Sequence, residues 1–152
     1  MRIMHRTTNG FTLIELVMVI GIAAILTAVA FSRINVASFD TEGFANQVSA
    51  TLRYAQKIAI SQRRNVTVAV STSAVSLTYP DIGQPVRQPP GTDPFTLSVP
   101  TAKGVSLGGT LTGSSFTFSA LGKPTTSGTI TVSGGDIASI TITVEAETGY
   151  VH

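Results

Sequence analysis

A long apolar segment near the start of the chain constrains its fold more than any other feature. The segment from Phe11 to Phe31 contains a single charged residue, Glu15. A helix of that length would extend about 31 Å at ~1.5 Å per residue, which matches the hydrocarbon core of a bilayer. The residues before Phe11 include Arg2 and Arg6 and no acid. The positive-inside rule therefore predicts that they stay in the cytoplasm while the rest of the chain crosses the membrane.

Glu15 occupies an energetically costly position. A carboxylate at the centre of a membrane helix costs roughly 2.5–3.5 kcal/mol, and less near a helix end. We therefore expect Glu15 to have a function and to need a cationic partner. Two simpler interpretations of this N-terminus remain open on these grounds alone. One is a secretory signal peptide with Ala28-Val29-Ala30 as its small-x-small cleavage site. The other is a plain membrane anchor that tolerates Glu15 near the interface.

The residues around Glu15 form a recognisable motif. Gly10 is followed by Phe-Thr-Leu-Ile-Glu-Leu at positions 11–16, which closely resembles the leader-peptide junction of type IV pilins and type II secretion pseudopilins. The resemblance implies cleavage by prepilin peptidase after Gly10 and N-methylation of Phe11. It also implies that Glu15 meets the N-terminal amine of a neighbouring subunit during assembly. Physical chemistry agrees, because the helix dipole favours a carboxylate near a helix N-terminus and a desolvated carboxylate needs a cation.

The expected organisation has three parts. Residues 1–10 are the cleaved leader, residues 11–40 a transmembrane and filament-core helix, and residues 41–152 a periplasmic head. A second helical pattern runs from about Thr41 to Gln62, with an apolar stripe that predicts a face packed on a sheet. The stripe consists of Phe44, Val48, Leu52, Ala55 and Ala59.

After Asn65 the apolar period changes to two, which predicts strands. The expected strands are residues 66–70, 74–79, 95–99, 116–118, 129–133 and 137–145, with Gly134-Gly135-Asp136 as the last turn. Alternation in the final strand indicates a sheet with one buried and one wet face. The expected fold is therefore α+β: a long N-terminal hydrophobic helix, the pilin spine, followed by a globular head with an antiparallel β-sheet packed on a helix.

The segment from Pro80 to Pro94 is expected to be a loop. It holds five of the seven prolines of the chain. Loops of this length are uncommon in compact domains and are often functional. We therefore predict a partner-contact surface there, with Pro80, Asp81, Arg87 and Asp93 as candidate contact residues.

The head shows a second, looser resemblance. The sequence LRYAQK at 52–57, continued by QRR at 62–64 and a valine-rich strand, is similar to the GspH/FimT-type domain of pseudopilins and minor pilins, as is FSALGKP at 118–124. This resemblance implies a structural subunit present in few copies, near the tip of a type IV pilus or a type II secretion pseudopilus.

The resemblance also implies the partners and the location. The partners are other pilin or pseudopilin subunits bound through the N-terminal helix, prepilin peptidase, an inner-membrane assembly platform, and lipid before assembly. The location is the bacterial inner membrane, crossed once, with the head in the periplasm until assembly into a periplasmic pseudopilus or a surface pilus. The sequence does not distinguish the two machines.

Two rival functions remain. One is a DNA-uptake or adhesive minor pilin that recognises a ligand through its head, and the other is a singly anchored or secreted binding domain unrelated to filaments. The charge balance argues against nucleic acid. The chain has ten basic and eight acidic side chains, and loss of Arg2 and Arg6 with the leader leaves eight of each. The closest cationic cluster is Arg53, Lys57, Arg63 and Arg64. We interpret it as solvated cations near a helix C-terminus, with lipid headgroups and nucleic acid as the alternatives.

Enzymatic chemistry has little support in the sequence. Cysteine is absent, and the two histidines are His5 in the leader and His152 at the end of the chain. No interior histidine or thiol is therefore available as a base, nucleophile or zinc ligand. We predict a non-enzymatic protein with no catalytic residues, no cofactor and no metal site.

Overall fold

A computed structural model describes residues 10–31, 36–88, 91, 93–134 and 138–152. The chain forms two compact units, Met1–Ile34 and Asn35–His152. The first unit contains helix α1, Leu13–Phe31, which is 19 residues long. Its window Leu13–Ala30 has a mean hydropathy of 2.6 and no buried residue, so α1 is long and apolar enough to cross a membrane. The predicted N-terminal apolar helix is confirmed.

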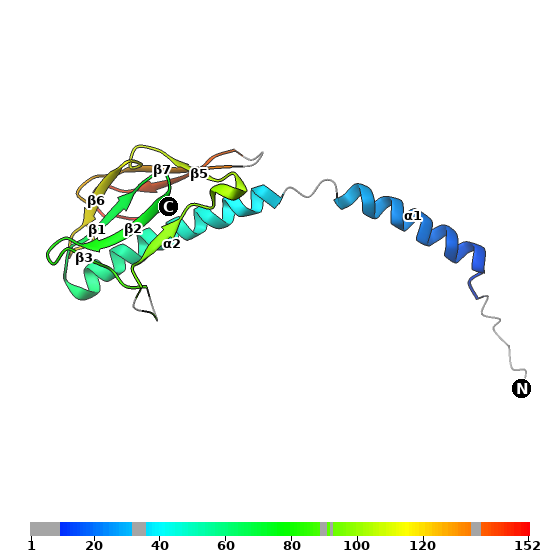
Figure 1. The fold of residues 1–152 in the computed structure, drawn as a ribbon, viewed down its shortest axis with the longest axis horizontal. Coiled ribbons are helices and arrows are strands. Elements are labelled where there is room, and N and C mark those ends of the chain that lie inside the picture. Colours follow the sequence, from blue (N-terminus) through cyan, green and yellow to red (C-terminus); the bar gives the residue numbers. More distant parts are fainter. Residues whose placement is uncertain (1–9, 32–35, 89–90, 92, 135–137) are drawn as a thin grey trace, which may run out of the picture. The chain divides into compact units, whose positions relative to one another are not determined.

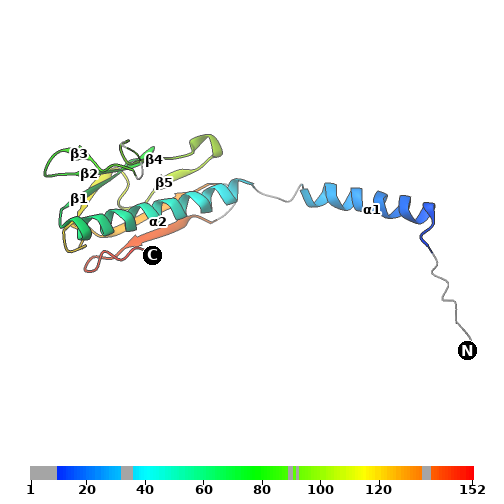
Figure 2. The same cartoon turned by 90° about the horizontal axis from the view of Figure 1, so that it is seen from below.

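The second unit, called the head below, is built on helix α2, Val36–Gln62. The side chains of the predicted apolar stripe are all buried. The helix begins earlier than the predicted Thr41, since the sequence pattern marks only the turns that pack against the sheets. Figures 1 and 2 show α2 lying along the strands of the head.

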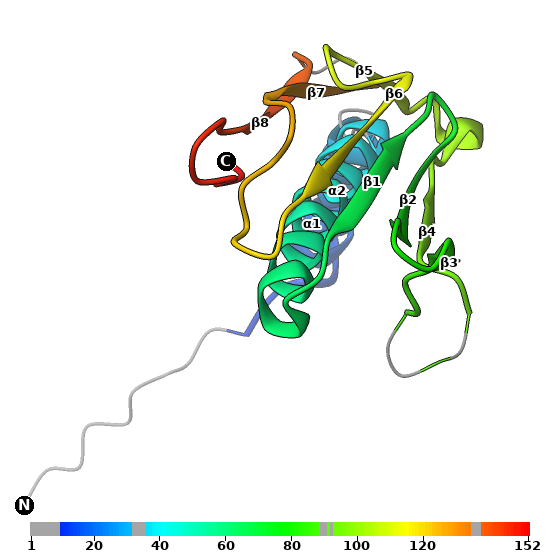
Figure 3. The ribbon, with the colours of Figure 1, turned by 90° about the vertical axis from the view of Figure 1, so that its left-hand side faces the viewer.

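Two antiparallel sheets cover α2, where one sheet was expected. The larger has the order β3-β2-β1-β6, with β4 also paired to β2, and the smaller has the order β5-β7-β8. Strands of both sheets contact α2, and Figure 3 shows them arranged around it. The strands are β1 Val66–Val70, β2 Ala74–Tyr79, β3 Gln84–Pro85, β4 Thr96–Ser98, β5 Ser106–Gly108, β6 Ser114–Phe118, β7 Gly128–Ser133 and β8 Ile140–Val144.

The alternating pattern in the sequence places the core strands correctly. In β1 the residues Val66, Val68 and Val70 are buried and those between them are half-buried. Strands β1 and β2 form an antiparallel hairpin that pairs Thr67 with Thr78. The α+β architecture is confirmed.

The structure differs from the sequence predictions at two places, and a third prediction is only partly covered by the described residues. The segment Pro80–Pro94 was expected to be a loop, but it contains β3 and an antiparallel bridge between Arg87 and Pro94. Proline is compatible with β3 because this strand lies at a sheet edge. Strand β5 and the 3₁₀ turn Thr101–Lys103 were missed, because short elements among glycines show no alternation. The predicted turn at Gly134-Gly135-Asp136 falls partly outside the described residues.

The core lies entirely in the head. The buried hydrophobic side chains of the described residues all fall between Phe44 and Val151. Each Val, Leu, Ile or Phe among them contributes roughly 1.5–3 kcal/mol when fully buried. Because α1 supplies none of this core, we expect residues 35–152 to fold without it.

Candidate assembly site

The N-terminus of α1 is fixed by Thr12. Its hydroxyl oxygen accepts a hydrogen bond from the backbone N–H of Glu15 at 3.3 Å. Its carbonyl oxygen accepts one from the N–H of Leu16 at 3.1 Å. Thr12 is therefore the N-cap and Glu15 the third helical residue, which is the spacing of a capping box. The residues of the prepilin-like motif thus also set where the helix begins.

Among residues 10–31, the part of its unit that the structure describes, Glu15 has no basic partner. The chain has no lysine, arginine or histidine from Gly10 to Phe31. The carboxylate lies in the first turn, where the helix dipole favours negative charge. Phe11 precedes Glu15 by about one turn, so cleavage after Gly10 would create an ammonium group at the same end of the segment. The arrangement can therefore pair a carboxylate with an amine.

The surface of α1 is apolar and exposed. Leu13 is 80% exposed, Ile14 71% and Met18 66%, and the side chains opposite them are exposed as well. Large exposed apolar surfaces of this kind mark contact with a membrane or with other protein surfaces. The helix therefore has the surface needed both for lipid and for packing against other apolar helices.

The four candidate contact residues of the Pro80–Pro94 segment have different surroundings. The Oδ2 atom of Asp81 accepts hydrogen bonds from Nη2 of Arg64 at 2.6 Å and from Nε at 3.0 Å. Pro80 and Asp93 are exposed, whereas Arg87 borders a hollow in the head. The structure therefore does not gather the four into one site.

The cationic cluster is also divided. The Arg53 guanidinium donates to the carbonyl oxygen of Val151, and Arg64 forms an ion pair with Asp81. Lys57 and Arg63 are exposed. Two of the four cations are thus engaged within the head, which differs from the predicted set of solvated side chains. Among the described residues, no group of three or more His, Cys, Asp or Glu could hold a metal ion.

Sequence reasoning missed two features of the molecule. The role of Thr12 could have been found from its Thr-x-x-Glu spacing, which is a recognised helix start. The contact between Arg53 and Val151 spans 98 positions and has no local signal.

A prepilin-like start, a membrane-length apolar helix and an α+β head built on a second helix together define a pilin-like subunit. Sequence comparison agrees. The model of a family described as "Type II transport protein GspH" matches residues 45–148, and the "Prokaryotic N-terminal methylation motif" matches residues 5–31. The chain belongs to the GspH family and is a pilin- or pseudopilin-type subunit. No curated protein matches it by sequence.

The fold is similar to that of a solved minor pilin. A crystal structure of the type IV minor pilin FimU from Pseudomonas aeruginosa, in space group P21, matches with a TM-score of 0.56 at 17% identity. The match covers 76% of this chain and 88% of that one. A second crystal form, in space group P65, gives a TM-score of 0.54, also at 17% identity, and covers 73% of this chain and 90% of that one. At 17% sequence identity, this structural similarity establishes the fold of the chain and nothing further.

Proposed function

We propose that this chain is a minor pilin or pseudopilin that is cleaved after Gly10, methylated at Phe11 and assembled through α1. The filament formed by this assembly is a type IV pilus or a type II secretion pseudopilus. The observation that carries the proposal is the geometry at the start of α1. Thr12 caps the helix, and Glu15 lies in the first turn of a segment without a basic side chain.

The role of Glu15 follows from its charge and its surroundings. Once α1 leaves the lipid, its apolar surface packs against the helices of other subunits and Glu15 is desolvated. A desolvated carboxylate requires a cation, and the N-terminal ammonium of a neighbouring Phe11 supplies one. The pair sets the axial register between the two subunits, because the other side chains of α1 are apolar, apart from Thr27, whose hydroxyl donates to the carbonyl of Ala23 in the same helix.

The proposed location and partners follow from this mode of assembly. Before assembly the protein crosses the inner membrane once, with the head in the periplasm. Prepilin peptidase and the inner-membrane assembly platform act on it at this membrane, and other pilin-type subunits are its partners in the filament. No catalytic role is assigned to the head.

The first experiment is the mass and N-terminal sequence of the protein isolated from its native membranes. We expect a start at N-methylated Phe11. A start at Phe31 would instead indicate a signal peptide, and an intact Met1 a plain anchor. Either result would refute the proposal and leave a secreted or anchored binding domain.

The second experiment tests Glu15 directly. Glu15→Ala is expected to leave cleavage and membrane insertion intact while removing the subunit from isolated filaments. Glu42→Ala is the matched control, because Glu42 is an exposed glutamate of the head. If Glu15→Ala and Glu42→Ala enter filaments equally well, Glu15 has no part in assembly.

DNA uptake through the head is the alternative that this fold would also permit. Counterion-release binding needs several free cations on one surface. In the cluster of Arg53, Lys57, Arg63 and Arg64, both Arg53 and Arg64 are already bonded within the head. This cluster therefore does not supply such a surface. We expect no retardation of DNA at physiological salt beyond non-specific affinities of about 10⁻⁴–10⁻⁶ M.

A further inference from the structure

A hollow of about 270 Å³ lies in the head between the C-terminal half of α2 and the β2–β3 hairpin. Tyr54 and Ile58 of α2 form one wall, and Tyr79 and Arg87 contribute to the other. The hollow therefore lies at the base of the Pro80–Pro94 segment, for which the sequence predicts a partner-contact surface.

The two tyrosine rings of the hollow are held in place from behind. Tyr54 stacks on Phe95 with ring centroids 5.3 Å apart. Tyr79 lies under the guanidinium of Arg64, whose central carbon is 4.6 Å from the ring centroid, and Arg64 is itself fixed by Asp81. Rings held this way lose little conformational entropy on binding a ligand. The walls of the hollow are therefore preorganised.

The phenol hydroxyls are available to a ligand. Among the residues that the structure describes, neither the Tyr54 nor the Tyr79 hydroxyl has a hydrogen-bond partner, and neither is sealed from solvent. Burial raises the pKa of Tyr54, and the nearby Tyr79 adds to that effect. The Tyr54 phenol therefore stays protonated at neutral pH and can donate a hydrogen bond.

The lining of the hollow favours a negative charge. Arg87 is an exposed guanidinium with no ion pair in the described part of the chain, and Gln62 and Gln84 add carboxamide donors. No lining residue is acidic, and the nearby Asp81 is already paired with Arg64. Ile58 and Val86 contribute apolar surface to a lining that is otherwise largely polar, and Ile82 at the rim is 50% exposed. A carboxylate attached to a short apolar stem fits both the donors and these apolar side chains.

The size of the hollow favours a side chain over a free metabolite. Pockets for small molecules usually have volumes of about 300–1,000 Å³ and enclose most of the ligand. This hollow lies at the lower limit of that range, and its rim carries the exposed Ile82, which offers apolar contact area to a larger partner. A neighbouring protein that inserts one acidic side chain satisfies both features.

We propose that this hollow binds a carboxylate side chain presented by the head of a neighbouring pilin-type subunit, with Arg87 as its charge partner. The proposal rests on the proposed function, since a filament supplies such a neighbour. It assigns to the β2–β3 hairpin a second contact between subunits, separate from α1. The carboxylate accepts hydrogen bonds from Arg87 and from the two phenols, while its stem contacts Ile58 and Val86.

The test is site-specific photocrosslinking of the full chain in its native membranes. A benzophenone amino acid replaces Ile82 at the rim, and the same probe at Leu121, which is 90% exposed, is the control for accessibility. Mass spectrometry maps the crosslinked residue. We expect Ile82 to crosslink to the head of another pilin-type subunit within a few residues of an Asp or Glu.

Three variants test the chemistry of the contact. Arg87→Glu is expected to reduce the crosslink at least tenfold, whereas Lys57→Glu, at another exposed cation of the head, leaves it unchanged. Changing the mapped partner carboxylate to arginine is expected to restore the crosslink in the Arg87→Glu background. Tyr79→Phe keeps the ring under Arg64 and is expected to weaken the crosslink severalfold. Urea unfolding of the isolated head checks that each variant remains folded.

The proposal is overturned if Ile82 crosslinks no better than Leu121 or only to lipid. It is also overturned if the partner peptide contains no carboxylate, or if Arg87→Glu has no effect. The N-terminus of the same samples is sequenced in parallel. A correct start at Phe11 with a negative crosslink rejects the hollow and leaves the proposed function intact, whereas a wrong start rejects the proposed function independently.

Discussion

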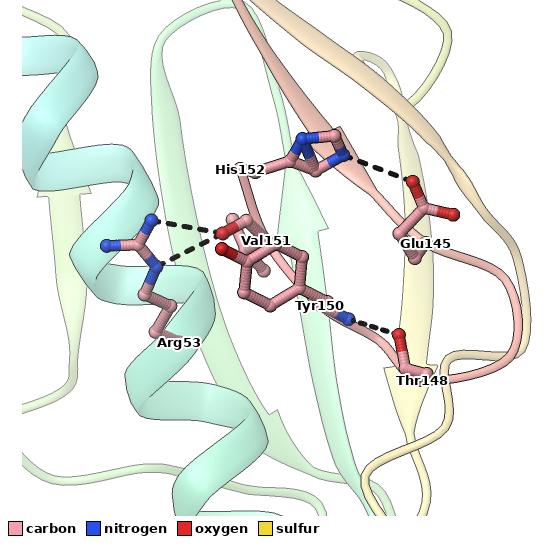
Figure 4. Close-up of polar contacts among 6 residues, drawn as sticks. All are labelled: Arg53, Glu145, Thr148, Tyr150, Val151 and His152. Carbon is pink, nitrogen blue, oxygen red and sulfur yellow. Dashed lines mark hydrogen bonds and ion pairs between the residues drawn. The ribbon is translucent and has the colours of Figure 1, made fainter.

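The guanidinium of Arg53 donates two hydrogen bonds to the carbonyl oxygen of Val151, from Nη2 at 3.0 Å and from Nε at 3.2 Å. Figure 4 shows this contact between the middle of α2 and the end of the chain. Val151 is buried and forms a bridge with Val144 of β8. Thr143 and His152 also exchange two backbone hydrogen bonds. The C-terminal residues thus extend the smaller sheet, and Arg53 ties that extension to α2.

Arg53→Ala is expected to destabilise the head by about 1–2 kcal/mol. A hydrogen bond to a charged group is worth about 1.5–3 kcal/mol, and partial solvent exposure of Arg53 lowers this figure. Urea unfolding of residues 35–152 measures the change. Lys57→Ala removes an exposed cation one turn further along α2 and is expected to change stability by less than about 0.5 kcal/mol. Equal effects of the two substitutions would show that the Val151 contact contributes nothing.

Gln56 forms a second connection between α2 and two loops. Its Nε2 atom donates to the carbonyl oxygens of Gly122 at 3.0 Å and Thr148 at 2.7 Å. Gln56→Glu keeps the shape of the side chain but places carboxylate oxygens against both carbonyls. We expect a loss of about 2 kcal/mol in urea unfolding, because two acceptors lose their donor and face a like charge. Gln47→Glu, at an exposed position of α2, is the control. A similar loss of stability there would contradict a specific role for the Gln56 hydrogen bonds.

These contacts mark the limit of what the sequence predicts. The apolar stripe of α2 and the alternation of β1 are periodic, and periodicity reports which face is buried. The Thr12–Glu15 spacing is equally local, so the start of α1 could be read from four residues. The contacts of Arg53 and Gln56 join residues more than 60 positions apart, and their partners are carbonyl groups that every residue has. Side-chain identity therefore could not reveal them.

The Pro80–Pro94 segment illustrates a different limit. Its prolines correctly indicate an interruption of the regular sheet. Because an edge strand tolerates proline, the same prolines do not exclude β3, which the sequence pattern does not predict. The two tyrosines of the hollow come from α2 and β2, and neither sequence environment marks them as neighbours. A surface assembled from separate elements becomes visible only when the fold places them together.

Gly83 and Gly149 have nearly equal φ angles but different surroundings. Substituting each by alanine therefore distinguishes the cost of backbone strain from the cost of a steric clash. Gly83 has φ of 64° and open space around it, whereas Gly149 has φ of 67° and lies against Gly122, Gln56 and Phe118. An added Cβ at Gly149 would meet the carbonyl oxygen of Gly122 and come within 3.1 Å of Cε1 of Phe118. Backbone atoms cannot move aside as a flexible side chain can.

Gly83→Ala is therefore expected to cost about 1 kcal/mol, the strain of an L-residue in the left-handed region. Gly149→Ala adds a backbone clash and is expected to cost roughly 3 kcal/mol or more in urea unfolding of the head. If the Gly149 variant does not fold, its soluble yield at reduced temperature relative to the Gly83 variant gives the same ranking. Equal stabilities would show that the C-terminal turn moves away without cost.

The C-terminus of α2 offers a stabilising substitution. The helix ends at Gln62, and Arg63 adopts φ of 50°, the left-handed conformation usually taken by glycine. The N–H of Arg64 donates to the carbonyl of Ala59 at 3.1 Å, and that of Arg63 donates to Ile60 at 3.3 Å. This is a Schellman cap with a strained residue at its left-handed position.

Arg63→Gly removes this strain, which is roughly 1–2 kcal/mol for an L-residue, and loses part of the gain to the more flexible unfolded chain. Arg63→Gln is the reference, because it also removes the charge near the helix C-terminus but keeps the strain. We expect the glycine variant of the head to be more stable than the glutamine variant by about 0.5–1 kcal/mol in urea. A glycine variant no more stable than the glutamine variant would mean that the cap holds Arg63 without strain.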